Sequence, residues 1–405
     1  MKLKSASLTS LVLSVAIVLA NPSANAQIFF TNQTSSTVNN LLSITFADAS
    51  AGYACGDAGT IVKTSNGGTI WTPLTSGTIE NLWDIKALPG SSGQKVIAVG
   101  DNNTVRKSVN GGTAWTALAI PFAPGSFVFG IHVIDTLNFY LCGGDFTTFS
   151  GAILKTNNGG SSWTLTAIPT SVFLDKIMFA NSNYGYTVGT NTSFSDGSIH
   201  RTTNGGASWS LVKTSVSIIT NLWCISQDTV IAVGLTGQIW RTTNAGSTWT
   251  SHSFNSTDLY GVVFYDKQNG FATGSNGLIL KTNDAGITWT QIPYSFPGTI
   301  QSVCIPNPGI FIAGDLGRIA KATLPPTGIN DFTFENTAFG IYPNPVNSVL
   351  YLFLKNSEKI IVTNTCGEII LQKNGDGKVE LDVSFFPAGI YFIKAGNEVR
   401  KFVKE

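Results

Sequence analysis

The segment KTSNGGTIWT (63–72) is one of six nearly identical ten-residue phrases in this chain. The others are KSVNGGTAWT (107–116), KTNNGGSSWT (155–164), RTTNGGASWS (201–210), RTTNAGSTWT (241–250) and KTNDAGITWT (281–290). Their tryptophans are Trp71, Trp115, Trp163, Trp209, Trp249 and Trp289, so the successive steps are 44, 48, 46, 40 and 40 residues. A period of this length is typical of propellers and other repeat arrays.

Each phrase closes a longer unit with the same plan. An apolar run, a polar turn, a second apolar run and a Gly-centred turn precede the phrase, as in residues 41–74. This pattern predicts four short strands joined by turns in every unit. The first strands share an aliphatic anchor, which raises the count to seven units: Ile44, Ile85, Ile131, Ile177, Ile225, Val262 and Val303.

The seventh unit is incomplete. It stops at Thr323, before any phrase, and therefore lacks a fourth strand. The segment IFFTNQTSS (28–36) has the apolar-then-polar character of a strand and belongs to no unit. Pairing this segment with unit seven would close the ring and remove exposed edges. We therefore expect an all-β chain whose main domain, residues 27–325, is a seven-bladed β-propeller.

The phrases place an Asn or Asp on a turn, followed by glycine. Such a side chain accepts backbone N–H bonds in its own turn, and glycine tolerates positive φ. On these residues the chain resembles the Asp-box, or bacterial neuraminidase repeat, propellers, in which the box is a structural turn. We therefore assign a structural role rather than a binding role to Asn66, Asn110, Asn158, Asn204, Asn244 and Asp284.

A second domain follows a Pro/Gly break, LPPTGINDF (324–332). Its motifs are YPNP (342–345), a Cys366–Gly367–Glu368 turn, LDVSFFPAGIYFIK (381–394) and the terminal KFVKE. These resemble the type IX secretion C-terminal sorting domain (type A) of Bacteroidota, although that family usually has an aspartate and G-K at the turn. The resemblance implies an immunoglobulin-like β-sandwich over residues 340–405 after a linker (326–339). It also implies export across the outer membrane, loss of this domain, and surface attachment or release.

The N terminus has the features of a signal peptide. Lys2 and Lys4 precede an apolar stretch at 8–20, and Ala24–Asn25–Ala26 is a small-x-small site, so we expect residues 1–26 to be removed after Ala26. No other apolar run approaches the ~20 residues that a spanning helix needs. The mature chain is therefore expected to be secreted, with no transmembrane segment.

Composition narrows the choice of partners. Lys and Arg total 24 against 23 for Asp and Glu, so there is no basic stripe for a nucleic-acid backbone. The three histidines occupy different registers, and we expect neither a metal site nor a cofactor. Four of the five cysteines lie in the repeats. A Cys55–Cys304 disulfide is allowed in an oxidising compartment, and buried free thiols are the alternative.

Phrase, unit length and unit count together resemble the photosystem II assembly/stability-factor-like group of propellers. In the photosynthetic members, a patch of arginines is implicated in binding. This propeller has only Arg106, Arg201, Arg241 and Arg318, and two of these occupy the repeated basic slot that opens the phrase. The photosystem role is therefore not carried over.

Asp-box propellers also include glycosidases, so an enzyme is the rival interpretation. A sialidase site would need three arginines and a Tyr–Glu pair, whereas the propeller has Glu80 alone and its arginines are misplaced. A polysaccharide-active glycosidase needs only two carboxylates at the correct separation. All four candidate carboxylates follow a glycine at the turn between the second and third strands, so a turn role is the alternative. They are Asp57, Asp101, Asp145 and Asp315.

The positions that differ most from unit to unit lie two residues before each anchor. In a propeller this is the mouth of the channel, where the innermost strands begin. Two enlarged turns, 145–151 and 190–197, lie on the same side. Aromatic and polar residues around a concave mouth suit a carbohydrate or peptide, and packing between blades is the alternative. Leu42 is one of the seven positions. The candidate ligand residues are the other six, Trp83, Phe129, Asp175, Trp223, Tyr260 and Gln301. We interpret the chain as a secreted, surface-displayed binding, adhesion or scaffold propeller without catalytic residues.

Overall fold

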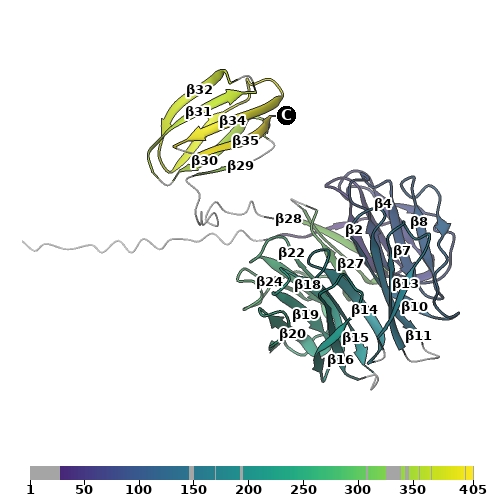
Figure 1. The fold of residues 1–405 in the computed structure, drawn as a ribbon. Coiled ribbons are helices and arrows are strands. Elements are labelled where there is room, and N and C mark those ends of the chain that lie inside the picture. Colours follow the sequence, from purple (N-terminus) through teal and green to yellow (C-terminus); the bar gives the residue numbers. More distant parts are fainter. Residues whose placement is uncertain are drawn as a thin grey trace, which may run out of the picture. The chain divides into compact units, whose positions relative to one another are not determined.

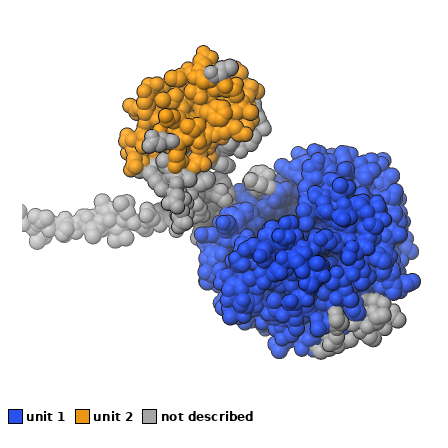
Figure 2. Space-filling model, viewed as in Figure 1, with its two compact units in different colours: residues 1–325 blue, residues 326–405 orange. Residues whose placement is uncertain are grey.

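The computed structural model describes residues 28–145, 150–168, 170–191, 195–306, 309–324, 339–342, 346–354, 356–365, 367–396 and 398–404. The chain divides into two compact units, residues 1–325 and 326–405 (Figure 2). The predicted signal peptide, its cleavage site and Cys366 lie outside the described residues.

Unit 1 is a seven-bladed propeller, as the repeats predict (Figure 1). Blade 1 contains β2 (Leu41–Phe46), β3 (Gly52–Gly56), β4 (Ile61–Thr64) and β5 (Thr72–Leu74), hydrogen-bonded in that order. The second strand, β3, is buried along its whole length, whereas the outermost strand, β5, is largely exposed. A strand covered on both faces has no solvent side. The second strands are therefore the most uniformly apolar part of each unit.

The same four-strand order is repeated in the next five blades. Blades 2 and 3 consist of β6 (Leu82–Ala87), β7 (Val96–Gly100), β8 (Val105–Ser108) and β9 (Thr116–Ala117), then β10 (Phe127–Val133), β11 (Phe139–Asp145), β12 (Ser150–Thr156) and β13 (Thr164–Ile168). Blade 4 consists of β14 (Ser171–Phe179), β15 (Gly185–Asn191), β16 (Gly197–Thr202) and β17 (Ser210–Ser215). Blades 5 and 6 consist of β18 (Ile219–Cys224), β19 (Val230–Gly234), β20 (Gln238–Thr242) and β21 (Thr250–Ser253), then β22 (Leu259–Phe264), β23 (Gly270–Gly274), β24 (Ile279–Thr282) and β25 (Thr290–Gln291).

Short 3-10 turns join the second and third strands of four blades. Each contains a non-glycine residue in the left-handed region, such as Ala58 at φ 53°. The turns are η1 (Asp57–Gly59), η2 (Leu235–Gly237), η3 (Ser275–Gly277) and η4 (Asp315–Gly317).

The seventh blade is completed by the N-terminal strand. Its order is β1 (Thr31–Gln33), β28 (Ile319–Thr323), β27 (Gly309–Gly314) and β26 (Ile300–Cys304). Strand β1 pairs antiparallel with β28, with Asn32 opposite Ala320. Just before β1, Ile28 and Phe30 are buried in the same cluster as Ile312. The predicted closure by residues 28–36 is thus confirmed.

The turn of the ten-residue phrase, called here the Asp-box turn for its resemblance to that motif, is organised around a buried hydroxyl. In the third phrase, Thr156 Oγ1 accepts a hydrogen bond from Gly160 N (3.0 Å) and donates one to Asn158 Oδ1 (2.9 Å). Asn158 Oδ1 also accepts from Ser162 N (2.9 Å). Gly160 has φ 93°, and a Cβ there would approach Leu118 Cδ1 to 2.6 Å, so the turn requires glycine.

The Asn158 amide itself is not buried beneath Trp163. Asn158 is exposed, whereas Thr156 is 1% exposed. The reason is geometric, because the hydroxyl reaches inward to the turn amides while the amide side chain follows the outside of the turn. The buried hydroxyl residues of the six phrases are Thr64, Ser108, Thr156, Thr202, Thr242 and Thr282.

We expect Thr156→Val to lower the free energy of unfolding by about 1–3 kcal/mol, since the buried Gly160 N–H loses its acceptor. Asn158→Ala should cost less, roughly 0.5–1.5 kcal/mol, because water can replace the exposed amide. Urea unfolding compares the two variants. Thr203→Val, at an exposed position of the next phrase, is the control and should stay within about 0.5 kcal/mol of the parent. A larger cost for Asn158→Ala than for Thr156→Val would contradict this assignment.

The repeated basic slot links neighbouring blades through Lys63, Lys107, Lys155, Arg241 and Lys321. Lys63 Nζ donates to the Gly111 carbonyl of the next blade at 2.8 Å. Lys321 Nζ makes the same bond to the Gly67 carbonyl (2.7 Å), from blade 7 to blade 1. Arg241 Nε likewise donates to the Ala285 carbonyl. These charges therefore stabilise the ring and are not free to form a binding patch.

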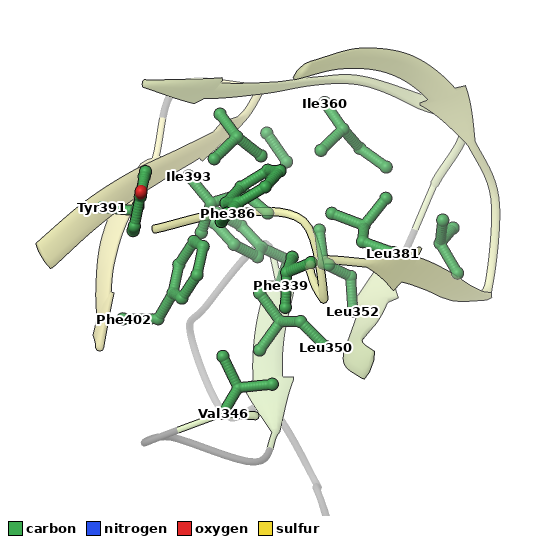
Figure 3. Close-up of a cluster of buried hydrophobic side chains, with 14 of the residues drawn as sticks. Phe339, Val346, Leu350, Leu352, Ile360, Leu381, Phe386, Tyr391, Ile393 and Phe402 are labelled. Carbon is green, nitrogen blue, oxygen red and sulfur yellow. The ribbon is translucent and has the colours of Figure 1, made fainter. Parts of the chain in front are cut away.

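Unit 2 is a β-sandwich, consistent with the predicted immunoglobulin-like domain. One sheet contains β29 (Phe339–Tyr342), β30 (Val349–Leu354) and β33 (Lys378–Asp382), and the other contains β32 (Ile369–Gly375), β31 (Glu358–Asn364), β34 (Gly389–Ala395) and β35 (Glu398–Lys404). Leu350 and Leu381 from the first sheet pack with Ile360, Ile393 and Phe402 from the second (Figure 3). Alternate residues of β33 and β34 face this core, which is the pattern of a half-buried strand.

Candidate functional site

Every innermost strand carries a β-bulge at the same place. In β6 the register shifts between Leu82 and Asp84, which leaves Trp83 as the extra residue. A bulge inserts one residue, bends the strand and re-aims a side chain. The seven extra residues, called here the bulge ring, are Leu42, Trp83, Phe129, Asp175, Thr220, Tyr260 and Gln301.

In blade 5 the structure corrects the sequence alignment. Leu222 pairs with Ala232 as Ile44 pairs with Ala54, so Leu222 and not Ile225 is the anchor. The run LWCI offers several aliphatic residues, and matching by residue type selects one three positions too late. The bulged residue is therefore Thr220, and Trp223 lies beyond the anchor, further along the channel.

The bulge ring is partly exposed. All seven residues are intermediate in burial, whereas the residue before each is fully buried, as Leu82 is before Trp83. Phe129 is the centre of an aromatic group, with ring centroids 5.5 Å from Trp83, 5.6 Å from Phe127 and 5.7 Å from Phe173. The aromatic residues thus pack partly on one another and partly face solvent.

The aspartates that follow the second strands are held by turn contacts. Asp101 accepts hydrogen bonds from Trp83 Nε1 and Asn81 Nδ2. Asp57 accepts from Asn40 Nδ2 (2.9 Å), and Asp315 accepts from Thr299 N (2.7 Å). These bonds fit a turn role. Residues 146–149 and 192–194, the central parts of the enlarged turns at 145–151 and 190–197, lie outside the described residues.

Tyr260 belongs to a similar contact. Its hydroxyl donates to Asp258 Oδ2 (3.5 Å), and Asp258 Oδ1 accepts from Thr236 N of the preceding blade. Burial raises the pKa of the Tyr260 phenol, so it is a neutral hydrogen-bonding group at neutral pH.

Asp175 is the acidic member of the bulge ring. Its Oδ2 is occluded and has no hydrogen-bond partner among the described residues. Burial raises the pKa of this carboxyl to about 7, and the nearby Lys176 ammonium opposes the shift. Asp175 is therefore a carboxyl of intermediate exposure whose Oδ2 atom does not face solvent in this structure. Gln301 is partly exposed in the equivalent position of blade 7.

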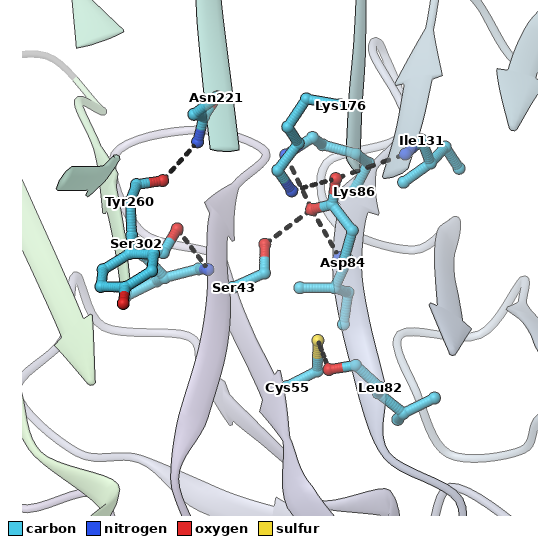
Figure 4. Close-up of polar contacts among 12 residues, drawn as sticks. Ser43, Cys55, Leu82, Asp84, Lys86, Ile131, Lys176, Asn221, Tyr260 and Ser302 are labelled. Carbon is cyan, nitrogen blue, oxygen red and sulfur yellow. Dashed lines mark hydrogen bonds and ion pairs between the residues drawn. The ribbon is translucent and has the colours of Figure 1, made fainter. Parts of the chain in front are cut away.

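A second arrangement lies deeper in the channel, and the sequence analysis missed it. The positions just before each anchor are also individual: Ser43, Asp84, Gly130, Lys176, Asn221, Gly261 and Ser302. Asp84 there accepts from Ser43 Oγ (2.7 Å), Lys86 Nζ (3.1 Å) and Lys176 Nζ (2.9 Å) (Figure 4). These residues differ from unit to unit, as the bulge-ring residues do, and that difference is the sequence signal that could have identified them.

This group, called here the Asp84 cluster (Ser43, Asp84, Lys86 and Lys176), is ionised. Burial raises the pKa of Asp84, but the ammonium groups of Lys176 and Lys86 and the Ser43 hydroxyl outweigh burial and hold it below its usual value. For Lys176, burial lowers the pKa, and the Asp84 charge more than reverses this. The cluster therefore contains one carboxylate held between two ammonium groups.

The four described cysteines are free thiols, so the Cys55–Cys304 disulfide is not formed. Cys55 is buried and donates to the Leu82 carbonyl (3.3 Å). Burial raises the pKa of both the Cys55 and the Cys304 thiols. They behave as small apolar side chains.

The comparisons agree with this architecture. Residues 340–405 match the model of a secretion system C-terminal sorting domain, and residues 23–171 match that of the photosynthesis system II assembly factor YCF48. The chain joins a YCF48-like propeller to a type IX secretion sorting domain. Such a sorting domain indicates secretion and surface attachment. None of the described helical segments has the length and apolar character of a membrane span.

Solved structures show the same fold at low identity. YCF48 bound to a D1 peptide is 18% identical at a TM-score of 0.59, with 73% of this chain and 97% of that chain covered. YCF48 from Cyanidioschyzon merolae is 18% identical at 0.58 over 73% and 98% of the two chains. The WD40 propeller domain of Doa1 is 12% identical at 0.56 over 74% and 98%. No curated protein matches the chain.

Proposed function

We propose that this YCF48-like propeller is a secreted, surface-displayed, non-catalytic module that binds a peptide or a carbohydrate at the bulge ring. The observation that carries the proposal is the recurrence of one bulge in all seven inner strands, each with a different, partly exposed residue. A repeat whose residues vary where a bulge re-aims the side chain is suited to recognition.

Exposed apolar side chains on the loops that lead into the inner strands also support binding at the bulge-ring face. Val38, Ile79 and Val216 each stand three residues before the buried first residue of their strand and are 79%, 85% and 94% exposed. Exposed apolar groups beside a concave site favour contact with a partner. The YCF48 relative bound to a D1 peptide supports a peptide as the ligand class.

Another hollow of the propeller is a weaker candidate. It lies at the edge of blade 1, with a volume of about 710 Å³, between residues 36–37, 58–61 and 73–79. Its lining includes neither an aromatic nor a titratable side chain. Ligand sites need a few convergent polar groups beside apolar surface, which the bulge ring has.

Peptide and glycan arrays probed with the isolated propeller, residues 27–325, test the proposal. We expect Trp83→Ala and Tyr260→Ala each to weaken binding of an array hit by about 2 kcal/mol, or roughly thirtyfold, as buried aromatic anchors do. Phe29→Ala is the matched control, since this aromatic side chain is 68% exposed and lies outside the bulge ring. Equal loss of binding in all three variants, with unchanged melting temperatures, would refute the site.

Export requires processing at both ends, and we propose a mature chain that begins at Gln27 and ends near residue 330. The grounds are the small-x-small site before Gln27 and the sorting-domain match at 340–405. Mass spectrometry of the surface form should recover an N-terminal peptide starting at Gln27. Recovery of a peptide containing Lys401–Glu405 from that form would contradict C-terminal removal.

A further inference from the structure

The Asp84 cluster lines a cavity of about 250 Å³ in the propeller channel. The titratable side chains of its lining are Asp84, Lys86, Lys176, His132 and Cys304. Burial, together with the charge of Lys86, lowers the pKa of His132 to about 4, and burial raises that of the Cys304 thiol. Both are therefore neutral at neutral pH. Two ammonium groups and one carboxylate leave the cavity with a net charge of +1.

The lysines have more donors than the cluster uses. An ammonium carries three N–H donors, and Asp84 is the one acceptor of both Lys86 and Lys176 among the described residues. Asp84 has no capacity left for further contacts, since its oxygens also accept from Ser43 Oγ, Ile85 N and Ile131 N. Both side chains line the cavity and are partly exposed, 37% for Lys86 and 24% for Lys176. Unused charged donors in a cavity favour an anionic acceptor.

The lining also has an apolar part that includes residues of blades 4 to 6, beside the polar Thr45, Asn221 and Ser302. Met178, Trp223, Val263 and Phe264 contribute to the cavity. A dry cavity of about 150 Å³ can hold a benzene molecule, so this volume accommodates a ring with one polar substituent. The occupant that matches both sides has one negative charge and an apolar body.

We propose that the channel is a second binding site, separate from the bulge ring, for a small carboxylate with an apolar body, whose carboxylate accepts hydrogen bonds from Lys86 and Lys176. The apolar body lies against Trp223 and Phe264. A free organic acid and the C-terminal carboxylate of a peptide offer the same chemistry.

Calorimetric titration of the purified protein with benzoate tests the proposal. We expect saturable 1:1 binding that is at least tenfold tighter than that of benzyl alcohol, which has the same ring without the charge. Lys86→Met should weaken benzoate binding at least tenfold, while Asp84 keeps its Lys176 partner. Lys267→Met, which removes an exposed lysine outside the cavity lining, should leave it unchanged. Because Trp83 and Tyr260 lie outside this lining, their alanine variants should bind benzoate as the parent does.

Absence of benzoate binding, or equal binding in the parent and Lys86→Met, would overturn the proposal. Should Lys86→Met fail to fold, the indole N–H resonance of Trp223 in the parent protein decides instead. It should shift with benzoate and not with benzyl alcohol, and an unshifted signal overturns the site. A tripeptide ending in Phe, compared with its C-terminal amide, distinguishes a peptide terminus from a free acid as the source of the carboxylate.

Discussion

Asp84→Asn is expected to lower the free energy of unfolding by about 3–5 kcal/mol, the cost of breaking a buried ion pair from one side. The Asp84 side chain is 1% exposed and is the counter-charge for Lys86 and Lys176. The amide would leave two ammonium groups facing each other without compensation. Guanidinium unfolding of the isolated propeller measures the loss.

Two further variants isolate the cause. Asp84→Asn combined with Lys176→Met removes one of the stranded charges and should recover part of the stability. Asp228→Asn, at an exposed aspartate, should change stability by less than about 0.5 kcal/mol. A loss below about 1 kcal/mol in Asp84→Asn would show that the cluster is not held by its charges.

The contribution of Asp84 to the free energy of unfolding depends on pH in a defined direction. Because the folded pKa of Asp84 is below its usual value, its contribution is fully present above the pKa of an unfolded aspartate, about 3.9. That contribution is lost as the pH falls through the folded pKa.

Removal of residues 27–36 is expected to abolish the monomeric propeller. Without β1, strand β28 becomes an exposed edge in blade 7, and unpaired edges invite association. The apolar side chains of Ile28 and Phe30 would also leave the cluster that they share with blade 7. Size-exclusion chromatography with light scattering should show oligomers or insoluble protein.

A matched control keeps the strand and changes only its surface. Thr31→Ala and Gln33→Ala alter side chains that lie at least partly at the surface, so that variant should remain a monomer. A truncated protein that is monomeric with the parent melting temperature would contradict closure by β1.

The repeat explains why so much of the fold could be predicted. Seven copies of one pattern average out the ambiguity of a single short strand, and the missing strand of unit seven left 28–36 as its complement. The same repetition marked the Asp-box turns as structural. Which side chain of the turn is buried was harder to predict, because Thr156 and Asn158 are both polar. Only their hydrogen bonds, from Gly160 N and Ser162 N, distinguish them.

The candidate site was predicted less completely, for two physical reasons. In blade 5 both Leu222 and Ile225 are aliphatic, so matching by residue type took as the anchor a residue three positions too late, and Trp223 replaced Thr220. The Asp84 cluster joins Ser43, Asp84 and Lys176 from three blades. Such contacts across the channel become visible only when the ring is closed.

Hydrogen–deuterium exchange on the isolated propeller, with and without a saturating array ligand, tests most directly whether the bulge ring is the binding face. We expect protection at the starts of the inner strands, around 82–84, 128–130 and 259–261, with the Asp-box turns unchanged. Protection confined to the Asp-box turns or to the outermost strands would contradict it.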